Sequence, residues 1–239
     1  MIDLFASGER AALGECTSGQ VSEGPLTLAV PVGSTEQHGP HLPLDTDTRI
    51  ATAVARGIAG QLDQLLAPAI AYGASGEHRG FAGTISIGTA ALTAVLVEYG
   101  RSACEWAARL VFVNGHGGNV DALRMAVTTL RAQGREAVWL SGYAEDADAH
   151  AGHTETSLLL HLSPAVVRTD RWVRGNTESL AELMPALRSG GIAAVSHSGV
   201  LGDPTTATAA DGARILAAMI ADGVARVRRW SPGPDGMLR

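Results

Sequence analysis

One short stretch concentrates side chains that commonly bind metal ions. Residues 33–48 read GSTEQHGPHLPLDTDT and contain two histidines, one glutamate and two aspartates. Two glycines and two prolines in the same stretch argue against a regular helix. Glu36 and His38 are two residues apart, so their side chains point the same way if the chain is extended. The stretch therefore indicates two ligands of one metal cluster, with Asp47 following nine residues after His38.

Two later motifs supply donors of the same chemical type. VFVNGHGGN places His116 after an apolar run, and HAGHTETS places His150 before a predicted helix and Glu155 near its first turn. Imidazole and carboxylate without sulfur suit Zn²⁺, Mn²⁺ or Fe²⁺. A carboxylate such as Asp47 can bridge two ions about 3.5–4 Å apart, and bound water then reaches a pKa of about 7. The pattern predicts a metal-dependent hydrolase able to cleave amides.

Other polar residues near these motifs have more than one interpretation. Glu77 and His78 in GEHRGFAGTISIG either line the pocket or only hold their own loop. Asp45 is interpreted as a turn residue or a helix cap. His41 lies between two prolines and His161 in an apolar helical segment, so both are interpreted as structural residues and not as ligands.

Strand-like and helix-like segments alternate along the chain. This alternation predicts βαβ units, and hence an α/β fold with a mainly parallel sheet. In such sheets ligands bind at the carboxyl ends of strands, where Glu36, His38 and His116 would lie. The predicted strands are 26–33, 65–73, 109–118 and 136–143. The predicted helices are 47–62, 89–108, 119–134, 154–164 and 208–229, with Asp47 or Thr48 as the N-cap of the first.

Composition narrows the function classes. The chain contains no lysine, which excludes a P-loop lysine, a Schiff-base lysine and a Ser/Lys dyad. A net charge of −6 without a marked basic cluster disfavours nucleic-acid binding and basic membrane anchoring. Two cysteines cannot form a disulfide framework. The start lacks a signal-peptide pattern, and no apolar run approaches the roughly 20 residues of a membrane span, so we expect a cytoplasmic protein.

The length suits one domain, 1–239, with a flexible tail from about residue 230, where SPGPDGMLR is rich in proline and glycine. Four ordered motifs in it, PVGSTEQHGPHLPLDTD, GFAGTISIG, VFVNGHGGN and HAGHTETS, resemble the creatininase (creatinine amidohydrolase) family, from about Leu26 to Ala218. The resemblance implies a single-domain three-layer α/β fold, a mostly parallel sheet flanked by helices. It also implies homo-oligomers, often hexamers, and a centre of two divalent ions (Zn, Fe or Mn) that hydrolyses amides.

The resemblance also implies roles for individual residues. Asp47 would bridge the two ions, Glu155 would lie beside the second ion, and His150 would be a catalytic histidine near the scissile amide. The remaining metal ligands implied by the family motifs are Glu36, His38 and His116.

One position departs from the family pattern. Creatininase itself has a glutamate two residues after the histidine of NGH, and this chain has Gly118 there. We therefore assign the second-metal carboxylate to Glu155 and do not expect creatinine as the substrate. The smaller residue is also expected to open space beside the metals for a bulkier substrate.

Further similarities within the family concern the substrate. LPLDTDTRIATAVAR, APAIAYGASGEH and GVLGDPTTATAADGA resemble peptidases that remove a C-terminal Val-Tyr dipeptide from a modified precursor peptide, releasing a pyrrolidinone core. Arg79 is a candidate partner for the peptide carboxylate, with surface solvation as the alternative. A hydrolase of a small cyclic amide or formamide is the second hypothesis. A non-catalytic binding module is disfavoured, because buried charged groups are costly to keep together without a use.

Overall fold

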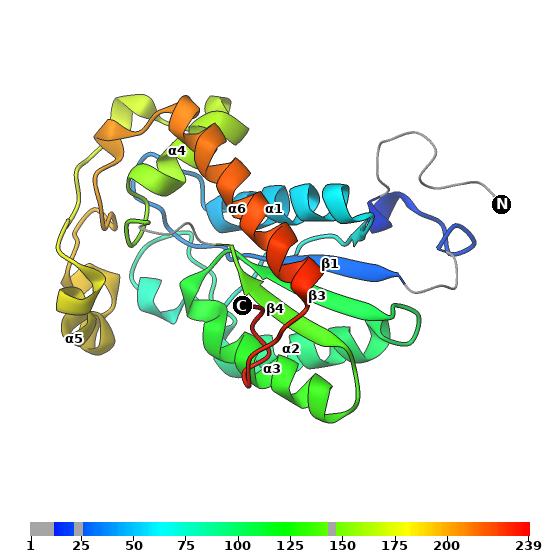
Figure 1. The fold of residues 1–239 in the computed structure, drawn as a ribbon. Helices are drawn as coiled ribbons and strands as arrows, with labels where there is room; N and C mark the ends of the chain where they lie inside the picture. Colours follow the sequence, from blue (N-terminus) through cyan, green and yellow to red (C-terminus); the bar gives the residue numbers. More distant parts are fainter. Residues whose placement is uncertain (1–11, 22–25, 143–146) are drawn as a thin grey trace.

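The computed structural model describes residues 12–21, 26–142 and 147–239, which Figure 1 colours along the chain. The acidic segment GYAEDADAH (142–150), for which the sequence predicts a loop, lies in part outside these residues. Among the helices of the described part, none is long and apolar enough to cross a membrane.

Four parallel strands form one sheet in the order β2-β1-β3-β4. The two central strands, β1 and β3, pair over their full length. Their runs of aliphatic residues are those of a parallel sheet buried on both faces. The strands are β1 (Thr27–Val32), β2 (Leu65–Leu66), β3 (Arg109–Asn114) and β4 (Ala137–Ser141).

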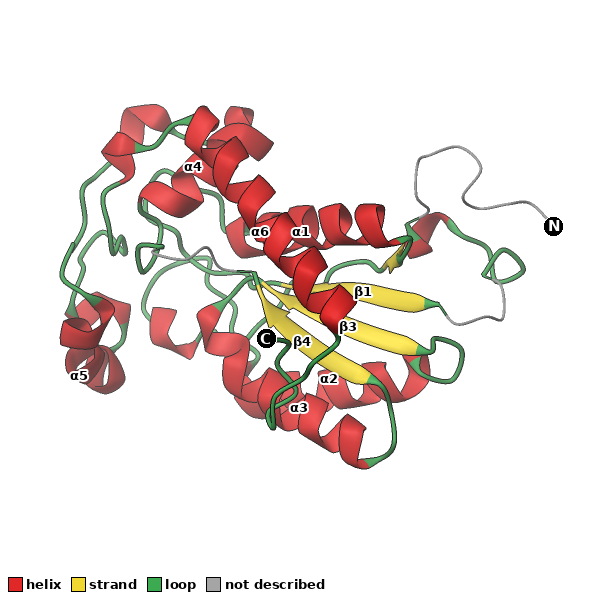
Figure 2. Ribbon diagram, viewed as in Figure 1, coloured by secondary structure: helices red, strands yellow, loops and turns green. Residues whose placement is uncertain are grey.

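Helices cover both faces of this sheet. In Figure 2, α1 and α6 lie on one face and α2 and α3 on the other, while α5 lies apart from the sheet. Helix α4 packs against α6 and α1. The six α-helices of the described residues are α1 (Thr46–Leu62), α2 (Gly88–Ala103), α3 (Val120–Ala132), α4 (His153–Leu162), α5 (Leu180–Gly190) and α6 (Ala209–Arg229).

Alternation along the strands divides the core into two halves. In β3, Val111 and Val113 join the cluster formed with α1, α4 and α6, and Leu110 and Phe112 join the cluster formed with α2 and α3. Successive strand side chains point to opposite faces, so each strand contributes to both halves. The predicted α/β fold with three layers is confirmed.

The second predicted strand is much shorter than expected. The sequence predicts a strand over 65–73, but β2 ends at Leu66. Pro68 has no N–H to donate to a strand ladder, which interrupts regular pairing. The chain still follows β1 beyond this point, because the Ile70 N–H donates to the Pro31 carbonyl at 2.9 Å. The segment therefore still reaches the carboxyl end of the sheet.

The C-terminal segment differs from the prediction of a flexible tail. Leu238 is fully buried, and its N–H donates to the Trp139 carbonyl at 2.8 Å. The Trp139 N–H in turn donates to the Gly236 carbonyl at 3.1 Å. Proline and glycine here form a turn that returns the chain to the sheet. A composition rich in these residues does not indicate that Leu238, which follows the turn, is buried.

Candidate metal centre

The side chains of the site come from the segments that follow the four strands, including the first turns of α1 and α4. Residues 33–47 follow β1, the short 3₁₀ turn Gly76–His78 follows β2, His116 follows β3, and residues 147–155 follow β4. Because parallel strands end at the same edge, these segments meet there. The structure brings Glu36, His38, Asp47, His116, His150 and Glu155 together in one cluster.

Two asparagines of NGHGGN fix the backbone that carries His116. The Asn114 amide donates to the His116 carbonyl at 2.8 Å, and the His116 N–H donates to the Asn114 side-chain oxygen at 3.2 Å. Asn119 donates to the Gly33 carbonyl at 2.9 Å and accepts from the Ala74 N–H at 2.9 Å. These bonds join the ends of β1 and β3 to the loop after β2, so the motif orders the whole edge.

Asp47 lies at the centre of the cluster, with one carboxylate oxygen toward each of two histidines. Its Oδ1 is 2.9 Å from Nε2 of His38, and its Oδ2 is 3.2 Å from Nδ1 of His116. The Ser34 hydroxyl donates to Oδ2 at 2.6 Å. The side chain is 2% exposed. A carboxylate so placed can bridge two cations, which is the role predicted for Asp47.

The predicted N-cap of α1 is wrong. Helix α1 begins at Thr46, so Asp45 holds the N-cap position and Asp47 and Thr48 lie in the first turn. The Asp45 side chain makes no capping bond and pairs with Arg49 at 2.8 Å. The Asp47 carboxylate is therefore free to point into the cluster.

Backbone carbonyls determine which ring nitrogen each of two histidines presents. Nδ1 of His38 lies 3.1 Å from the Glu36 carbonyl, and Nε2 of His150 lies 2.8 Å from the Gln37 carbonyl. A carbonyl can only accept, so these nitrogens carry the protons. Nδ1 of His150 then has a free lone pair, and Nε2 of His38, which faces Asp47, is the nitrogen that a metal ion would bind in place of a proton. Nδ1 of His150 lies 4.0 Å from Oε1 of Glu36, so the free nitrogen faces the cluster.

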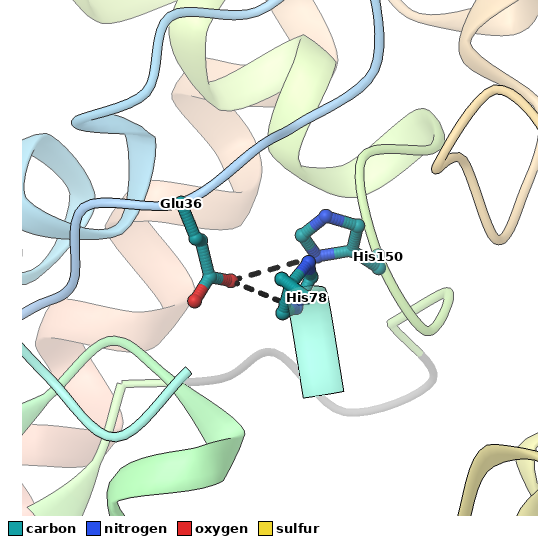
Figure 3. A group of neighbouring side chains, drawn as sticks. All are labelled: Glu36, His78 and His150. Atoms are coloured by element: carbon teal, nitrogen blue, oxygen red, sulfur yellow. Dashed lines mark ion pairs between the residues drawn. The ribbon is translucent and has the colours of Figure 1, made fainter. Parts of the chain in front are cut away.

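The surroundings of Glu36 indicate whether the cluster fits a metal ion. Its side chain is 0% exposed, and neither carboxylate oxygen has a hydrogen-bond partner among the described residues. Oε1 lies 3.2 Å from Nε2 of His78 and Oε2 lies 3.1 Å from Nε2 of His116; Figure 3 shows Glu36 facing His78 and His150. A buried carboxylate without hydrogen bonds is costly unless a cation compensates it. The residues therefore fit a divalent metal ion.

The electrostatics of the cluster favour cations. Burial alone would lower the pKa of His38, but Asp47, Glu155 and Glu36 raise it to about 10. Burial alone would raise the pKa of Asp47, but His38 and His116 hold it well below its usual value. Burial raises the pKa of Glu155 to about 7. Carboxylates this close together outweigh the cost of burying positive charge, so the cluster attracts a cation.

Among the described residues, three groups of three side chains bring their donor atoms within 4.8 Å of one another. Glu36, Asp47 and His116 form the first set, and His38, His150 and Glu155 form the second. The third group shares members with both and consists of Glu36, His78 and His150 (Figure 3). Oε2 of Glu155 lies 3.9 Å from Nε2 of His38. Asp47 contacts a histidine of each set, so the two sets are adjacent.

The structure decides between the two interpretations of His78. The Gly39 N–H donates to Oε1 of Gln37, so the Gln37 amide nitrogen is a donor toward Nδ1 of His78 at 3.0 Å. Nε2 of His78 then carries the proton and faces Glu36. His78 is buried and belongs to the cluster, where its Nε2 lies 3.2 Å from Oε1 of Glu36 without forming a hydrogen bond of good geometry.

The two histidines interpreted as structural lie away from the donor sets. His41 is buried, and its Nε2 lies 2.9 Å from the Thr156 hydroxyl. His161 is exposed in the last turn of α4. Neither belongs to a group of residues that could hold a metal ion.

A cavity of about 1120 Å³ opens beside the cluster. Its floor includes Asp47, His116 and Glu155, and one wall comes from α5, which the sequence analysis did not predict. The sequence signal that could have predicted the start of α5 is a capping box. In it the Ser179 hydroxyl accepts a hydrogen bond from the Glu182 N–H, and the Glu182 carboxylate accepts one from the Ser179 N–H. Pro185 inside the helix obscures this signal.

Arg79, the candidate partner for a peptide carboxylate, does line this cavity. Arg188 of α5 lines it too. Both side chains belong to exposed residues, and neither forms an ion pair with another described residue. The cavity thus combines an acidic metal-binding floor with two available cationic groups.

A family profile described as "Creatininase: Creatinine amidohydrolase" matches residues 15–227. The chain belongs to the creatininase family. Creatininases are metal-dependent amidohydrolases, and this chain is accordingly a metal-dependent hydrolase of C–N amide bonds. The resemblance predicted from the four motifs is confirmed.

Named relatives place the chain within the creatininases. The mycofactocin precursor peptide peptidase of Mycobacterium tuberculosis is 64% identical over 236 residues, covering 95% of this chain and 94% of that protein. The protein of the same name from Mycolicibacterium smegmatis is 61% identical over 240 residues, covering 98% and 96%.

Solved creatininase structures share the fold. A manganese form of creatininase superposes with a TM-score of 0.77 at 29% identity, covering 92% of this chain and 98% of that one. A Zn-Zn form of a creatininase mutant gives a TM-score of 0.76 at 29% identity, with the same coverage. The metals in these structures support a divalent-metal centre in this chain.

Two histidine variants should distinguish a metal ligand from a histidine that does not bind metal. We expect His38→Ala to lose metal affinity, because Nε2 of His38 points at Asp47 and Glu155. His161→Ala should keep wild-type metal content and change stability by no more than about 0.5 kcal/mol, as for an exposed side chain. Metal analysis of the two purified variants checks both. Equal metal loss in the two would show that the donor set is wrongly assigned.

Proposed function

We propose that this chain is a peptidase with two divalent ions that removes the C-terminal Val-Tyr dipeptide from the modified mycofactocin precursor peptide, releasing its pyrrolidinone core. The observation that carries the proposal is Asp47, whose two oxygens face His38 and His116 at the floor of a large cavity. The identity to the two mycobacterial peptidases supports the substrate.

The proposed ligands fall on both sides of Asp47. Glu36 and His116 would hold one ion and His38 and Glu155 the other, with Zn, Fe or Mn as candidates. When bound, such ions polarise the amide carbonyl and make water nucleophilic near neutral pH.

His150 would move the proton in this reaction. Burial, together with His38 and His78, lowers the pKa of His150 well below its usual value, so the imidazole is neutral. Its unprotonated Nδ1 faces the cluster and can take the proton of the attacking water. As the C–N bond breaks, the same nitrogen can give that proton to the leaving amine. Hydrolysis leaves a carboxylate on the N-terminal fragment and a free amine on the released C-terminal fragment.

The cavity suits the end of a peptide. At about 1120 Å³ it exceeds the usual range of about 300–1,000 Å³ for small-ligand pockets. Leu180, Met184 and Leu187 of α5 offer an apolar wall for the Val and Tyr side chains. Arg79 and Arg188 offer charge for the terminal carboxylate.

Mass spectrometry of the modified precursor, the unmodified precursor and creatinine, each incubated with the protein, tests the proposal. We expect Val-Tyr release from the modified precursor only, and loss of that release after chelator treatment, restored by added metal. Release by a metal-free sample would contradict the metal-dependent mechanism. Efficient creatinine hydrolysis without dipeptide release would favour the second hypothesis, a hydrolase of a small cyclic amide or formamide.

The remaining parts of the proposal concern stoichiometry and assembly. We expect about two ions per chain, measured by elemental analysis of protein purified without added metal. We also propose a cytoplasmic homo-oligomer, a hexamer or similar, which light scattering after gel filtration would check.

A further inference from the structure

The glycine that replaces the glutamate of creatininase has a neighbour from another loop. A Cβ atom built on Gly118 would lie 2.3 Å from the Ala74 carbonyl oxygen, 2.5 Å from Nε2 of His116 and 2.6 Å from Oε1 of Glu77. Real Cβ atoms essentially never approach other atoms so closely. Any side chain at 118 would therefore require the backbone at Ala74 to shift as well as His116 and Glu77, and the Glu77 carboxylate is one of the groups that close the space beside Gly118. The expectation that Gly118 itself widens the substrate site is not met.

Glu77 stands close to Nε2 of His116. Its Oε1 is 3.3 Å from this nitrogen, which Oε2 of Glu36 also approaches at 3.1 Å, while Nδ1 on the other side of the ring faces Asp47 at 3.2 Å. The side chain of Glu77 is 34% exposed, whereas that of Glu36 is 0% exposed. Glu77 therefore approaches the cluster from the cavity side.

We propose that Glu77 is a positioning residue of the metal centre, which pairs with Nε2 of His116 in the space left by Gly118. An imidazole that binds a metal through one nitrogen usually donates its other N–H to a carboxylate or carbonyl, which fixes the ring and raises its basicity. Here the pair would leave Nδ1 of His116, on the Asp47 side, for the ion. This inference rests on the proposed two-metal function and extends it to a residue outside the predicted ligand set.

The pairing explains why a loop after β2 takes part in a centre otherwise built on α1, α4 and the segments that follow β1 and β3. The turn Gly76–His78 places two neighbouring side chains on two different ligands, Glu77 on His116 and His78 on Glu36. The Asn119 bond to the Ala74 N–H holds the approach to this turn against β3. The turn would therefore support two of the three ligands of the first donor set, His116 and Glu36.

Metal competition titration against a chromogenic chelator tests the inference. We expect Glu77→Ala to weaken the binding of one ion by about 10–100-fold, the usual effect of removing such a support, and to leave the other unchanged. Glu77→Gln keeps an acceptor oxygen and should lose less. Glu178→Gln, an exposed residue without an ion pair to other described residues, is the control and should match wild type.

The outcomes separate this inference from the proposed function. If wild type binds two ions and Glu77→Ala binds both with wild-type affinity, the positioning role is wrong and the two-metal function stands. If Glu77→Gln loses as much affinity as Glu77→Ala, the negative charge and not the hydrogen bond matters, which also contradicts the pairing. If wild type itself binds no divalent metal, the proposed function fails first. Circular dichroism of each variant confirms that it is folded.

Discussion

Replacement of Asp47 by asparagine should remove both metal ions and abolish hydrolysis. The substitution keeps the size of the side chain, but a neutral amide has one oxygen where the carboxylate has two. Its NH₂ would point at either His38 or His116, each of which faces a carboxylate oxygen now. We expect a larger loss of metal affinity than the roughly 10–100-fold typical of residues that only support a ligand.

Elemental analysis and activity assays of Asp47→Asn, with Asp45→Asn as the matched control, check this result. Asp45 lies two residues earlier and pairs with Arg49 outside the cluster, so its variant should retain both metal content and activity. Retention of one ion by Asp47→Asn would show that Asp47 serves a single ion and is not a bridge.

Replacement of His150 by asparagine should slow turnover by about 10²–10⁴-fold, the usual contribution of a general acid or base. Asparagine can still donate to the Gln37 carbonyl that now accepts from Nε2 of His150. It has no titratable nitrogen in place of Nδ1, so the proton of the attacking water has no carrier. Metal content should stay near the wild-type value, because the four proposed ligands and Asp47 are unchanged.

The measurements are kcat on the modified precursor and the metal content of the same sample. Exogenous imidazole should restore part of the activity, because the cavity beside His150 has room for it. A fall in metal content that parallels the fall in kcat would instead make His150 a ligand, in the donor set with His38 and Glu155.

The ligands could be predicted from the sequence because each lies next to the end of a predicted strand or the start of a predicted helix, where the local residue pattern is distinctive. Glu36 and His38 follow the apolar run of β1, and His116 follows that of β3 within a motif whose asparagines bond its own backbone. Such signals involve neighbours in the chain, and the rule for parallel sheets then brings the strand ends together. The fold class followed from the same alternation.

The features that were missed depend on contacts between distant segments. Whether Glu77 and His78 join the site depends on where the loop after β2 lies relative to the end of β3. That position follows from the order of the strands in the sheet, which hydrophobic periodicity does not predict. Helix α5 was missed because Pro185 and a polar neighbourhood mask its capping box. The order of the C-terminus depends on Leu238, whose side chain is buried in the hydrophobic core.

The pairing of the C-terminus with Trp139 has a consequence for assembly. Strand β4 is an edge of the sheet, and an unpaired edge is a template for strand addition by another chain. Here the outward N–H and carbonyl of Trp139 are both engaged by residues 236–238, and the Ala137 carbonyl accepts from Arg131. The protein therefore blocks this edge with its own last residues. We therefore do not expect an oligomer of this protein to continue the sheet across subunits at β4.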